Sequence, residues 1–214
     1  MIPALVIFDC DGVLVDSEII SNQVMMANLA RYGLTLDLSD CMRLFVGSTM
    51  VGVRTKALEL GADLPKDWID EVYEETYARL KQDVPVVAGI PTLLGKLGEA
   101  EIAFCVASNG SEEKMRITLG NNDLWDLFQG RMFSAHTLGT AKPDPTLFEI
   151  AAGQFGASSQ SCVVIEDSTS GVTAAARAGM RCLGYAPHHD GDDLRALGAE
   201  VFKDMVDVSA LLGL

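Results

Sequence analysis

Four short apolar runs recur along the chain, and each has the length and composition of a buried β-strand. They cover residues 5–8, 102–107, 162–165 and 180–185. Continuous apolar runs of this length are typical of strands that are covered on both faces of a sheet. Helical patterns lie between the later runs, and strands that alternate with helices form parallel sheets. The pattern therefore predicts an α/β fold with a Rossmann-like, doubly wound parallel sheet.

The stretch between the first and second runs breaks this alternation. It contains helical patterns at residues 18–32, 51–60 and 67–81, and it offers no convincing buried strand. We therefore expect residues 17–86 to form an inserted α-helical domain. Residues 1–16 and 87–214 are then expected to form the α/β core domain.

Length and charge limit the classes of partner. The 214 residues are enough for one large domain, or for a medium-sized domain with an insertion. The net charge of −14 argues against a surface that binds nucleic acid or an anionic membrane. A small anionic substrate stays compatible with this charge, because a metal ion and nearby lysines can override the overall field. We expect a monomer that acts on a small molecule.

The cysteines indicate a reducing compartment. The chain has five cysteines, they are scattered, and they contain no Cys-x-x-Cys pair. No apolar run reaches the roughly 18 residues of a membrane span. The N-terminus opens directly on a strand, without a basic region or a cleavage site. We therefore expect a cytoplasmic protein.

Two carboxylates follow the first apolar run. Asp9 and Asp11 are two residues apart, and such residues share a face in an extended segment. Gly12 lets the backbone turn sharply after them. Two close carboxylates repel each other, and one tends to stay protonated unless a cation lies between them. The pair therefore indicates a hard metal ion, an acid/base pair, or both.

Polar residues also follow the second and third runs, as Ser108 and Asn109 and as Glu166 and Asp167. In open α/β sheets, ligands bind at the carboxyl ends of the strands, near a switch point in strand order. Four carboxylates at one edge need a cation at neutral pH, and oxygen ligands without a nearby histidine favour Mg²⁺ over zinc. The Ser108 hydroxyl, backbone N–H groups and Lys142 suit phosphate oxygens.

Each of these residues also has an ordinary structural explanation when it is taken alone. The aspartate pair can be a solvated strand end, Ser108 a helix cap, and Lys142 a surface lysine. Glu166 and Asp167 can cap the helix that follows them. The shared position at strand ends is what favours a site. Lys114, on the helix after Ser108, can face either the cleft or solvent.

Four motifs in a fixed order span nearly the whole chain. They are Asp9-x-Asp11-Gly-Val-Leu-Val-Asp16-Ser17-Glu18, Ser108-Asn109-Gly110, Lys142-Pro-Asp-Pro145 and Ile165-Glu166-Asp167-Ser168-x-x-Gly171. With them the chain resembles the haloacid dehalogenase (HAD) superfamily, in its helical-cap branch of phosphatases and β-phosphoglucomutase-like proteins. The stretch Ser108-Asn-Gly-x-x-x-Lys114-Met115 is also similar to bacterial 6-phosphogluconate phosphatases.

The resemblance implies catalytic and metal-binding roles. Asp9 is implied to be the nucleophile that forms an aspartyl-phosphate, and Asp11 the acid and base that serves the leaving alcohol and the water. The implied cofactor is Mg²⁺, held by Asp9, the Asp11 backbone carbonyl and Asp167, with Glu166 in or near its shell.

The resemblance also implies how a substrate is held. Ser108, Asn109 and Lys142 are implied to bind the phosphate, and residues 17–86 are implied to form a mobile cap that selects the leaving group. The implied activity is that of a Mg²⁺-dependent phosphatase. Its substrate is expected to be a small phosphorylated metabolite of the sugar phosphate class, with 6-phosphogluconate as one candidate.

Other functions stay open on the sequence. Phosphomutases of the β-phosphoglucomutase type carry a cap histidine, and residues 17–22 contain none. A non-catalytic protein that binds a phosphorylated metabolite would be expected to have lost Asp9, Asp11 or Lys142, and all are present. Haloacid dehalogenase chemistry needs neither Asp11 as a proton donor nor a carboxylate-bound metal.

Overall fold

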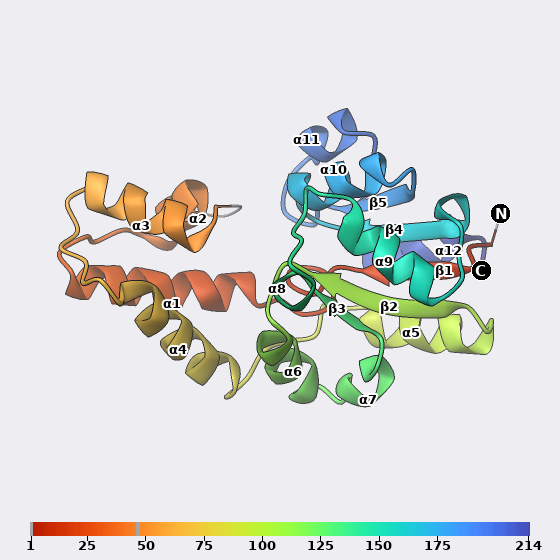
Figure 1. Cartoon of the computed structure of the whole chain (residues 1–214), viewed down its shortest axis with the longest axis horizontal. Helices are drawn as coiled ribbons and strands as arrows, with labels where there is room; N and C mark the ends of the chain where they lie inside the picture. Colours follow the sequence, from red (N-terminus) through yellow and green to blue (C-terminus); the bar gives the residue numbers. More distant parts are fainter. Residues whose placement is uncertain (1, 46–47) are drawn as a thin grey trace. The chain divides into compact units, whose positions relative to one another are not determined.

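The computed structural model of the chain describes residues 2–45 and 48–214. The chain divides into two compact units (Figure 1). The α/β unit consists of Met1–Asp16 and Pro85–Leu214, and the helical unit consists of Ser17–Val84. The second division lies two residues before the boundary expected at residue 86.

The α/β unit is built on a parallel sheet of six strands in the order β3-β2-β1-β4-β5-β6. The strands are β1 (Leu5–Phe8), β2 (Ala103–Ser108), β3 (Met132–Ser134), β4 (Cys162–Glu166), β5 (Arg181–Tyr185) and β6 (Glu200–Phe202). The central strand β1 pairs with β2 on one side and β4 on the other, so its carboxyl end is a switch point. The predicted fold class, a doubly wound parallel sheet with a helical insertion, is confirmed.

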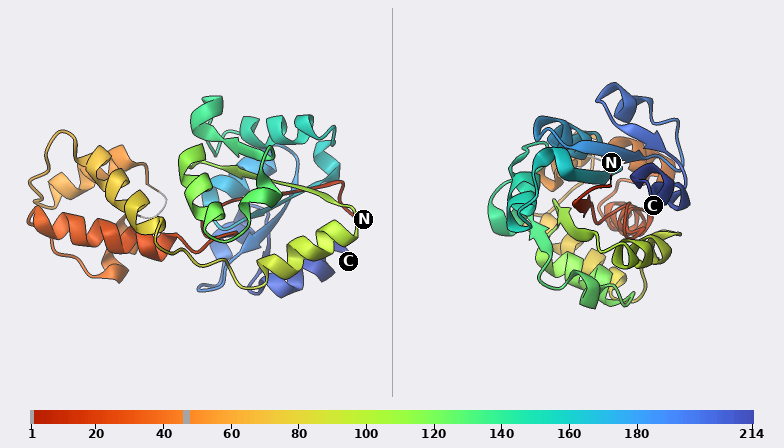
Figure 2. Two further views of the ribbon diagram at one scale, coloured as in Figure 1. Left: turned by 90° about the horizontal axis from the view of Figure 1, so that it is seen from below. Right: turned by 90° about the vertical axis from the view of Figure 1, so that its right-hand side faces the viewer.

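Helices connect the strands of this unit and cover both faces of the sheet (Figure 2). They are α5 (Ile90–Glu99), α6 (Glu112–Gly120), α7 (Trp125–Phe128), α8 (Ala135–Leu138), α9 (Thr146–Gln154), α10 (Thr169–Arg177), α11 (Asp192–Ala196) and α12 (Val208–Leu212), with the 3₁₀ turns η1 (Ser159–Ser161) and η2 (Met205–Asp207). Across the described residues 2–45 and 48–214, no helix combines the length and the apolar character needed to cross a bilayer.

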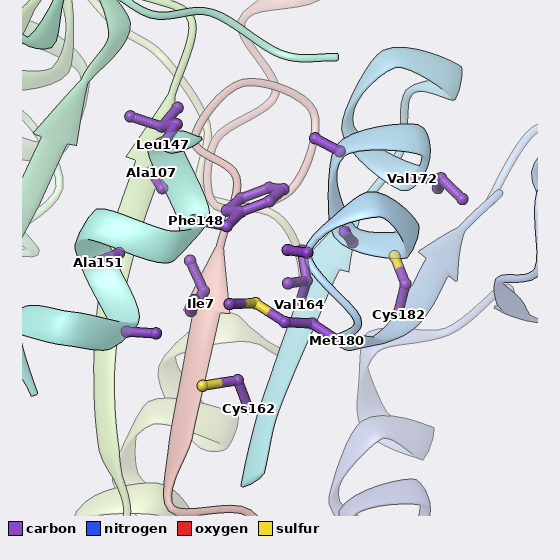
Figure 3. Close-up of a cluster of buried hydrophobic side chains, with 14 of the residues drawn as sticks. Ile7, Ala107, Leu147, Phe148, Ala151, Cys162, Val164, Val172, Met180 and Cys182 are labelled. Atoms are coloured by element: carbon purple, nitrogen blue, oxygen red, sulfur yellow. The ribbon is translucent and has the colours of Figure 1, made fainter. Parts of the chain in front are cut away.

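Alternate residues of the central strands build the two sides of the core. Ile7 and Val164 face helices α9 and α10, where they pack with Phe148 and Val172 (Figure 3). Neighbouring residues point to the other face because side chains alternate along a strand. A fully buried core on both faces fixes the sheet rigidly, and it thereby fixes the residues that follow each strand.

An aromatic cluster lies on the opposite face of the sheet. Phe8 of β1, Phe104 of β2 and Phe128 of α7 meet edge to face, with ring centroids 5.4–6.5 Å apart. Such edge-on contacts add to the area that aromatic rings bury. They anchor β1 one residue before Asp9, so the position of that carboxylate is set by the core.

The helical unit contains α1 (Glu18–Arg31), α2 (Leu38–Phe45), α3 (Met50–Glu59) and α4 (Trp68–Leu80). It has a hydrophobic core of its own, which includes Leu29 and the fully buried Trp68. The buried Asn28 accepts a hydrogen bond of 2.7 Å from the Trp68 indole N–H. This bond satisfies a polar pair inside an otherwise apolar interior.

Several short elements were not expected from the apolar pattern, among them β3, β6 and α2. The edge strands β3 and β6 have three residues each, and α2 has eight. Elements of this length span one or two periods, so their pattern is weak. The start of α2 carries a local signal instead, because the Asp37 carboxylate accepts the Asp40 N–H at 2.7 Å.

Candidate active site

Asp9 lies at the carboxyl end of the central strand. Its backbone N–H donates to the Ile165 carbonyl of β4 at 2.9 Å, which extends the sheet by one residue. The turn that follows needs Gly12, whose φ is +81°. A Cβ atom at Gly12 would lie 1.9 Å from an Asp167 carboxylate oxygen. The glycine therefore lets the loop after β1 approach Asp167 closely.

Lys142 is buried between two carboxylates. Its Nζ donates to Asp9 Oδ1 at 2.5 Å and to Glu166 Oε1 at 2.6 Å, and only 2% of its side chain is exposed. Its ammonium group also lies 5.1 Å from the centre of the Phe148 ring. Burial disfavours the charge, but Asp9 and Glu166 outweigh it and raise the pKa of Lys142. The lysine therefore stays charged at neutral pH.

The position of Lys142 is fixed by Asn109. The Asn109 carboxamide accepts the Lys142 backbone N–H at 2.9 Å and donates to the Lys142 carbonyl at 3.2 Å. Both hydrogen bonds join the loop after β2 to the segment that carries the lysine. The side chain of Asn109 thus holds the backbone of Lys142 in place, and the phosphate contact implied for Asn109 stays a prediction.

The Glu166 carboxylate is held from several directions. Its Oε2 accepts the backbone N–H groups of Asp167 at 3.1 Å and Ser168 at 3.0 Å, and the Ser168 hydroxyl at 2.8 Å. A Cβ atom at Gly171 would lie 1.8 Å from the carboxyl carbon of Glu166. The absence of a side chain in this first turn of α10 makes room for the carboxylate.

Three carboxylates form a candidate metal site. Ligand oxygens of Asp9, Glu166 and Asp167 all lie within 4.8 Å of one another. The donor set contains only carboxylate oxygens, which fits a hard divalent cation and does not fit a soft one. The cluster is therefore suited to hold such an ion at the carboxyl ends of β1 and β4.

The proximity of these charges changes the acidity of Asp9. Its pKa is raised to about 7, chiefly by burial, with Glu166 and Asp11 adding to the increase and Lys142 opposing it. A cation at the site favours the ionised carboxylate. Without one, Asp9 is close to its midpoint of protonation at neutral pH.

Ser108 and Asp11 face each other across Gly110. The buried Ser108 ends β2, and its Oγ accepts the Gly110 N–H at 2.9 Å. A Cβ atom at Gly110 would lie 3.2 Å from Ser108 Oγ and 3.5 Å from Asp11 Oδ2. The loops after β1 and β2 are therefore in close contact, as their shared position at the strand ends predicts.

Lys114 completes the group and faces the site. Its Nζ lies 2.8 Å from Asp11 Oδ1. Burial lowers the pKa of this lysine, but Asp11 outweighs the effect and raises it.

The sequence left open whether Lys114 faces the cleft, and it gave no sign that Phe148 contacts Lys142. Gly171 carried a signal, because a glycine in the first turn of a helix often marks a close approach.

The comparisons with known proteins agree with this arrangement. A family model described as haloacid dehalogenase-like hydrolase matches residues 6–185. The 6-phosphogluconate phosphatase of Escherichia coli (strain K12) is 31% identical over 188 residues, which cover 86% of this chain and 84% of that protein.

Two solved structures are similar over nearly their whole length. A haloacid dehalogenase-like protein of unknown function from Agrobacterium tumefaciens str. C58 has a TM-score of 0.88 and 33% identity, covering 98% of this chain and 97% of that one. A HAD family hydrolase from Deinococcus radiodurans R1 with bound phosphate and sodium has a TM-score of 0.85 and 32% identity, covering 98% and 95%. The chain therefore belongs to the haloacid dehalogenase-like hydrolase family.

Proposed function

We propose that this hydrolase is a Mg²⁺-dependent phosphatase for a small phosphorylated metabolite of the sugar phosphate class. The observation that carries the proposal is the buried Asp9, which ends the central strand between Lys142 and the carboxylates of Glu166 and Asp167. The similarity to a 6-phosphogluconate phosphatase makes 6-phosphogluconate the first substrate to test. The similarity to a hydrolase with bound phosphate supports the class of ligand.

In this proposal Asp9 is the nucleophile. One of its oxygens attacks phosphorus, the ester P–O bond breaks, and an aspartyl-phosphate forms. Lys142 donates to Asp9 Oδ1 and can also reach a phosphate oxygen bound beside it. Its charge offsets part of the repulsion between the carboxylate and the phosphate.

Asp11 is proposed as the acid and base of the two steps. It gives a proton to the leaving oxygen and then takes one from the water that hydrolyses the aspartyl-phosphate. Its carboxylate is 20% exposed, which allows contact with a leaving group and with water.

The proposed ligands of Mg²⁺ are the side chains of Asp9 and Asp167 and the backbone carbonyl of Asp11, with Glu166 beside them. When bound, the ion supplies positive charge against the nucleophile and the phosphate dianion. Ser108, Asn109 and the backbone N–H groups after β2 are proposed to bind phosphate oxygens, and the Asn109 carboxamide also keeps Lys142 aligned with them.

We propose that the helical insertion, residues 17–86, serves as the cap domain that selects the leaving group. It folds around its own core, so its surface residues can vary without disturbing the sheet. The protein is proposed to work as a monomer, which a sedimentation or light-scattering mass measurement checks.

The test uses purified protein and p-nitrophenyl phosphate, with added Mg²⁺ and with a chelator. We expect phosphate release that depends on Mg²⁺, loss of this activity in Asp9→Asn, and a phosphoenzyme that only variants with Asp9 can form. Full activity of Asp9→Asn would refute the proposal. Interconversion of glucose 1-phosphate and 6-phosphate would instead identify a phosphomutase, and binding without turnover would identify a phosphometabolite-binding protein.

A further inference from the structure

The two aspartates after β1 have different cationic partners. Asp9 pairs with Lys142, whose side chain is 2% exposed, whereas Asp11 pairs with Lys114, and these two side chains are 20% and 21% exposed. The first pair is the more deeply buried, with 12% of the Asp9 side chain exposed. The second pair is more open to solvent, so a leaving group and a water molecule can approach its carboxylate more easily.

Helix α6 is docked on the segment that carries Asp11. Thr118 lies one turn after Lys114, so both residues are on the same face of the helix. The buried Thr118 Oγ1 lies 3.8 Å from the Cys10 sulfur and donates to the Lys114 carbonyl at 3.1 Å. Lys114 therefore extends toward Asp11 from a helix that contacts Cys10, the residue before Asp11.

A glycine brings Lys114 and Asp11 together beside Ser108. A Cβ atom at Gly110 would lie 3.5 Å from Asp11 Oδ2 and 3.6 Å from Lys114 Cδ. Both side chains therefore lie beside Gly110, at ordinary contact distance from that position. The ion pair of 2.8 Å between Lys114 Nζ and Asp11 Oδ1 then restricts the carboxylate.

The pair is not explained by stability. A partly exposed ion pair typically contributes about 0–1 kcal/mol to the free energy of unfolding. The pair matters more through the position that it gives Asp11, because a displacement of about 1 Å in a catalytic group can lower a rate by about a hundredfold.

We propose that Lys114 is a positioning residue that holds the Asp11 carboxyl group in place for proton transfer to and from the reacting oxygens. The proposal rests on the phosphatase function proposed above. In the first step the Asp9–P bond forms, the ester P–O bond breaks, its electron pair goes to the leaving oxygen, and Asp11 supplies the proton. In the second step water attacks phosphorus, its proton goes to Asp11, and the Asp9–P bond breaks.

The test compares leaving groups that need a proton with leaving groups that do not. p-Nitrophenolate leaves readily without protonation, whereas an alkyl alkoxide depends on general acid catalysis. The values of kcat/KM are measured for p-nitrophenyl phosphate and for a simple alkyl phosphate, because kcat/KM reports the steps up to the first bond cleavage. The proteins are the wild type, Lys114→Met, Lys114→Gln and Lys114→Arg, with Lys96→Met of the exposed face of α5 as the matched control.

We expect Lys114→Met and Lys114→Gln to lower kcat/KM for the alkyl phosphate about tenfold more than for the aryl phosphate. Lys114→Arg should restore part of the difference, since it can pair with Asp11. Lys96→Met should behave like the wild type. Inhibition by inorganic phosphate should change little in any variant, because the phosphate is held by other residues.

Two results would overturn the proposal. An equal loss for both leaving groups would show that Lys114 does not act through proton transfer, and weaker phosphate inhibition with an unchanged leaving-group ratio would make it a phosphate ligand. Thr118→Val tests the docking independently, and it should move the ratio in the same direction if Lys114→Met fails to fold. Absence of wild-type turnover with every phosphate would instead refute the phosphatase function itself.

Discussion

The α/β unit and the helical unit each contain a network of acidic side chains joined by a basic one, and the two networks differ in burial. In the α/β unit, Lys142 lies between Asp9 and Glu166 and is 2% exposed. In the helical unit, Arg31 joins Glu71 and Glu75 and is 49% exposed. The same pairing of charges therefore occurs in two very different environments.

The pKa values of one carboxyl group in each network, Asp9 and Glu71, move in opposite directions. Burial raises the pKa of Asp9 to about 7 in spite of Lys142. In the helical unit, the hydrogen bonds from Tyr32 and then from Arg31 lower the pKa of Glu71. Burial in an apolar interior disfavours charge, whereas hydrogen bonds at the surface favour it at little cost. A buried charge cluster thus needs a reason to persist, and the proposed Mg²⁺ would supply one for the first network.

The largest expected effect comes from breaking the buried network. Lys142→Met leaves Asp9 and Glu166 without their partner, and removal of one member of a buried ion pair typically costs about 3–5 kcal/mol. Urea denaturation in the presence of a chelator measures the free energy of unfolding. The exposed Lys203→Met is the control, with an expected change within about 0.5 kcal/mol. A loss below about 1 kcal/mol for Lys142→Met would contradict the role of burial.

A second variant tests the space that holds Glu166. Gly171→Ala places a methyl group at a position 1.8 Å from the Glu166 carboxyl carbon, so the carboxylate must move away from its donors. We expect a loss of about 1–3 kcal/mol. The matched control is Gly153→Ala in α9, where a Cβ atom meets nothing within 4 Å. That change should stabilise the protein by about 0.5–1 kcal/mol. Equal changes in the free energy of unfolding at both sites would be evidence that Glu166 does not need the space beside Gly171.

The pH dependence of metal binding tests the raised pKa of Asp9. A carboxyl group must lose its proton to bind a metal, so protons compete with Mg²⁺ below a pKa of about 7. The dissociation constant for Mg²⁺ should therefore be about tenfold larger at pH 6 than at pH 8, as measured by calorimetry. A dissociation constant that is the same at pH 6 and at pH 8 would show that Asp9 is already ionised in the metal-free protein.

The smallest effect is expected in the helical unit. Arg31→Ala should cost about 0–1 kcal/mol at neutral pH, because the pair is exposed and screened by salt. The lowered pKa of Glu71 stabilises the fold above its ordinary value of 4.5, and this contribution is lost as the pH falls through the lowered pKa. Urea denaturation gives the free energy of unfolding at pH 7 and at pH 3. The difference between these two values should be smaller for Arg31→Ala than for the wild type. If Arg31→Ala lowered the free energy of unfolding more than Lys142→Met does, the exposed network would be the more important one for stability.

Much of the fold was accessible from the apolar pattern. The predicted runs at 5–8 and 162–165 correspond to β1 and β4. These two strands are far apart in the sequence and pair with each other at the centre of the sheet. A strand that is buried on both faces must be apolar throughout, so its sequence identifies it. The edge strands β3 and β6 are too short for such a pattern, and they form because a neighbouring strand offers unpaired backbone groups.

The candidate site was predicted as a set of residues, and their catalytic roles stay predictions. What could not be derived was which side chain meets which. Lys142 and Asp9 are separated by 133 positions, and their contact depends on the order of the strands between them. The pattern also gave no sign that the Asn109 amide binds the backbone of Lys142.

The sequence by itself determined which chemistry is present, because strand periodicity, glycines at sharp turns and carboxylates at strand ends are local properties of the chain. Only the tertiary structure decided how that chemistry is divided. It buried Lys142 between Asp9 and Glu166, and it placed Lys114 on the more exposed Asp11. The physical reason is that the energy of a charge depends on its solvent exposure and its neighbours. Both of these are set when distant segments pack together.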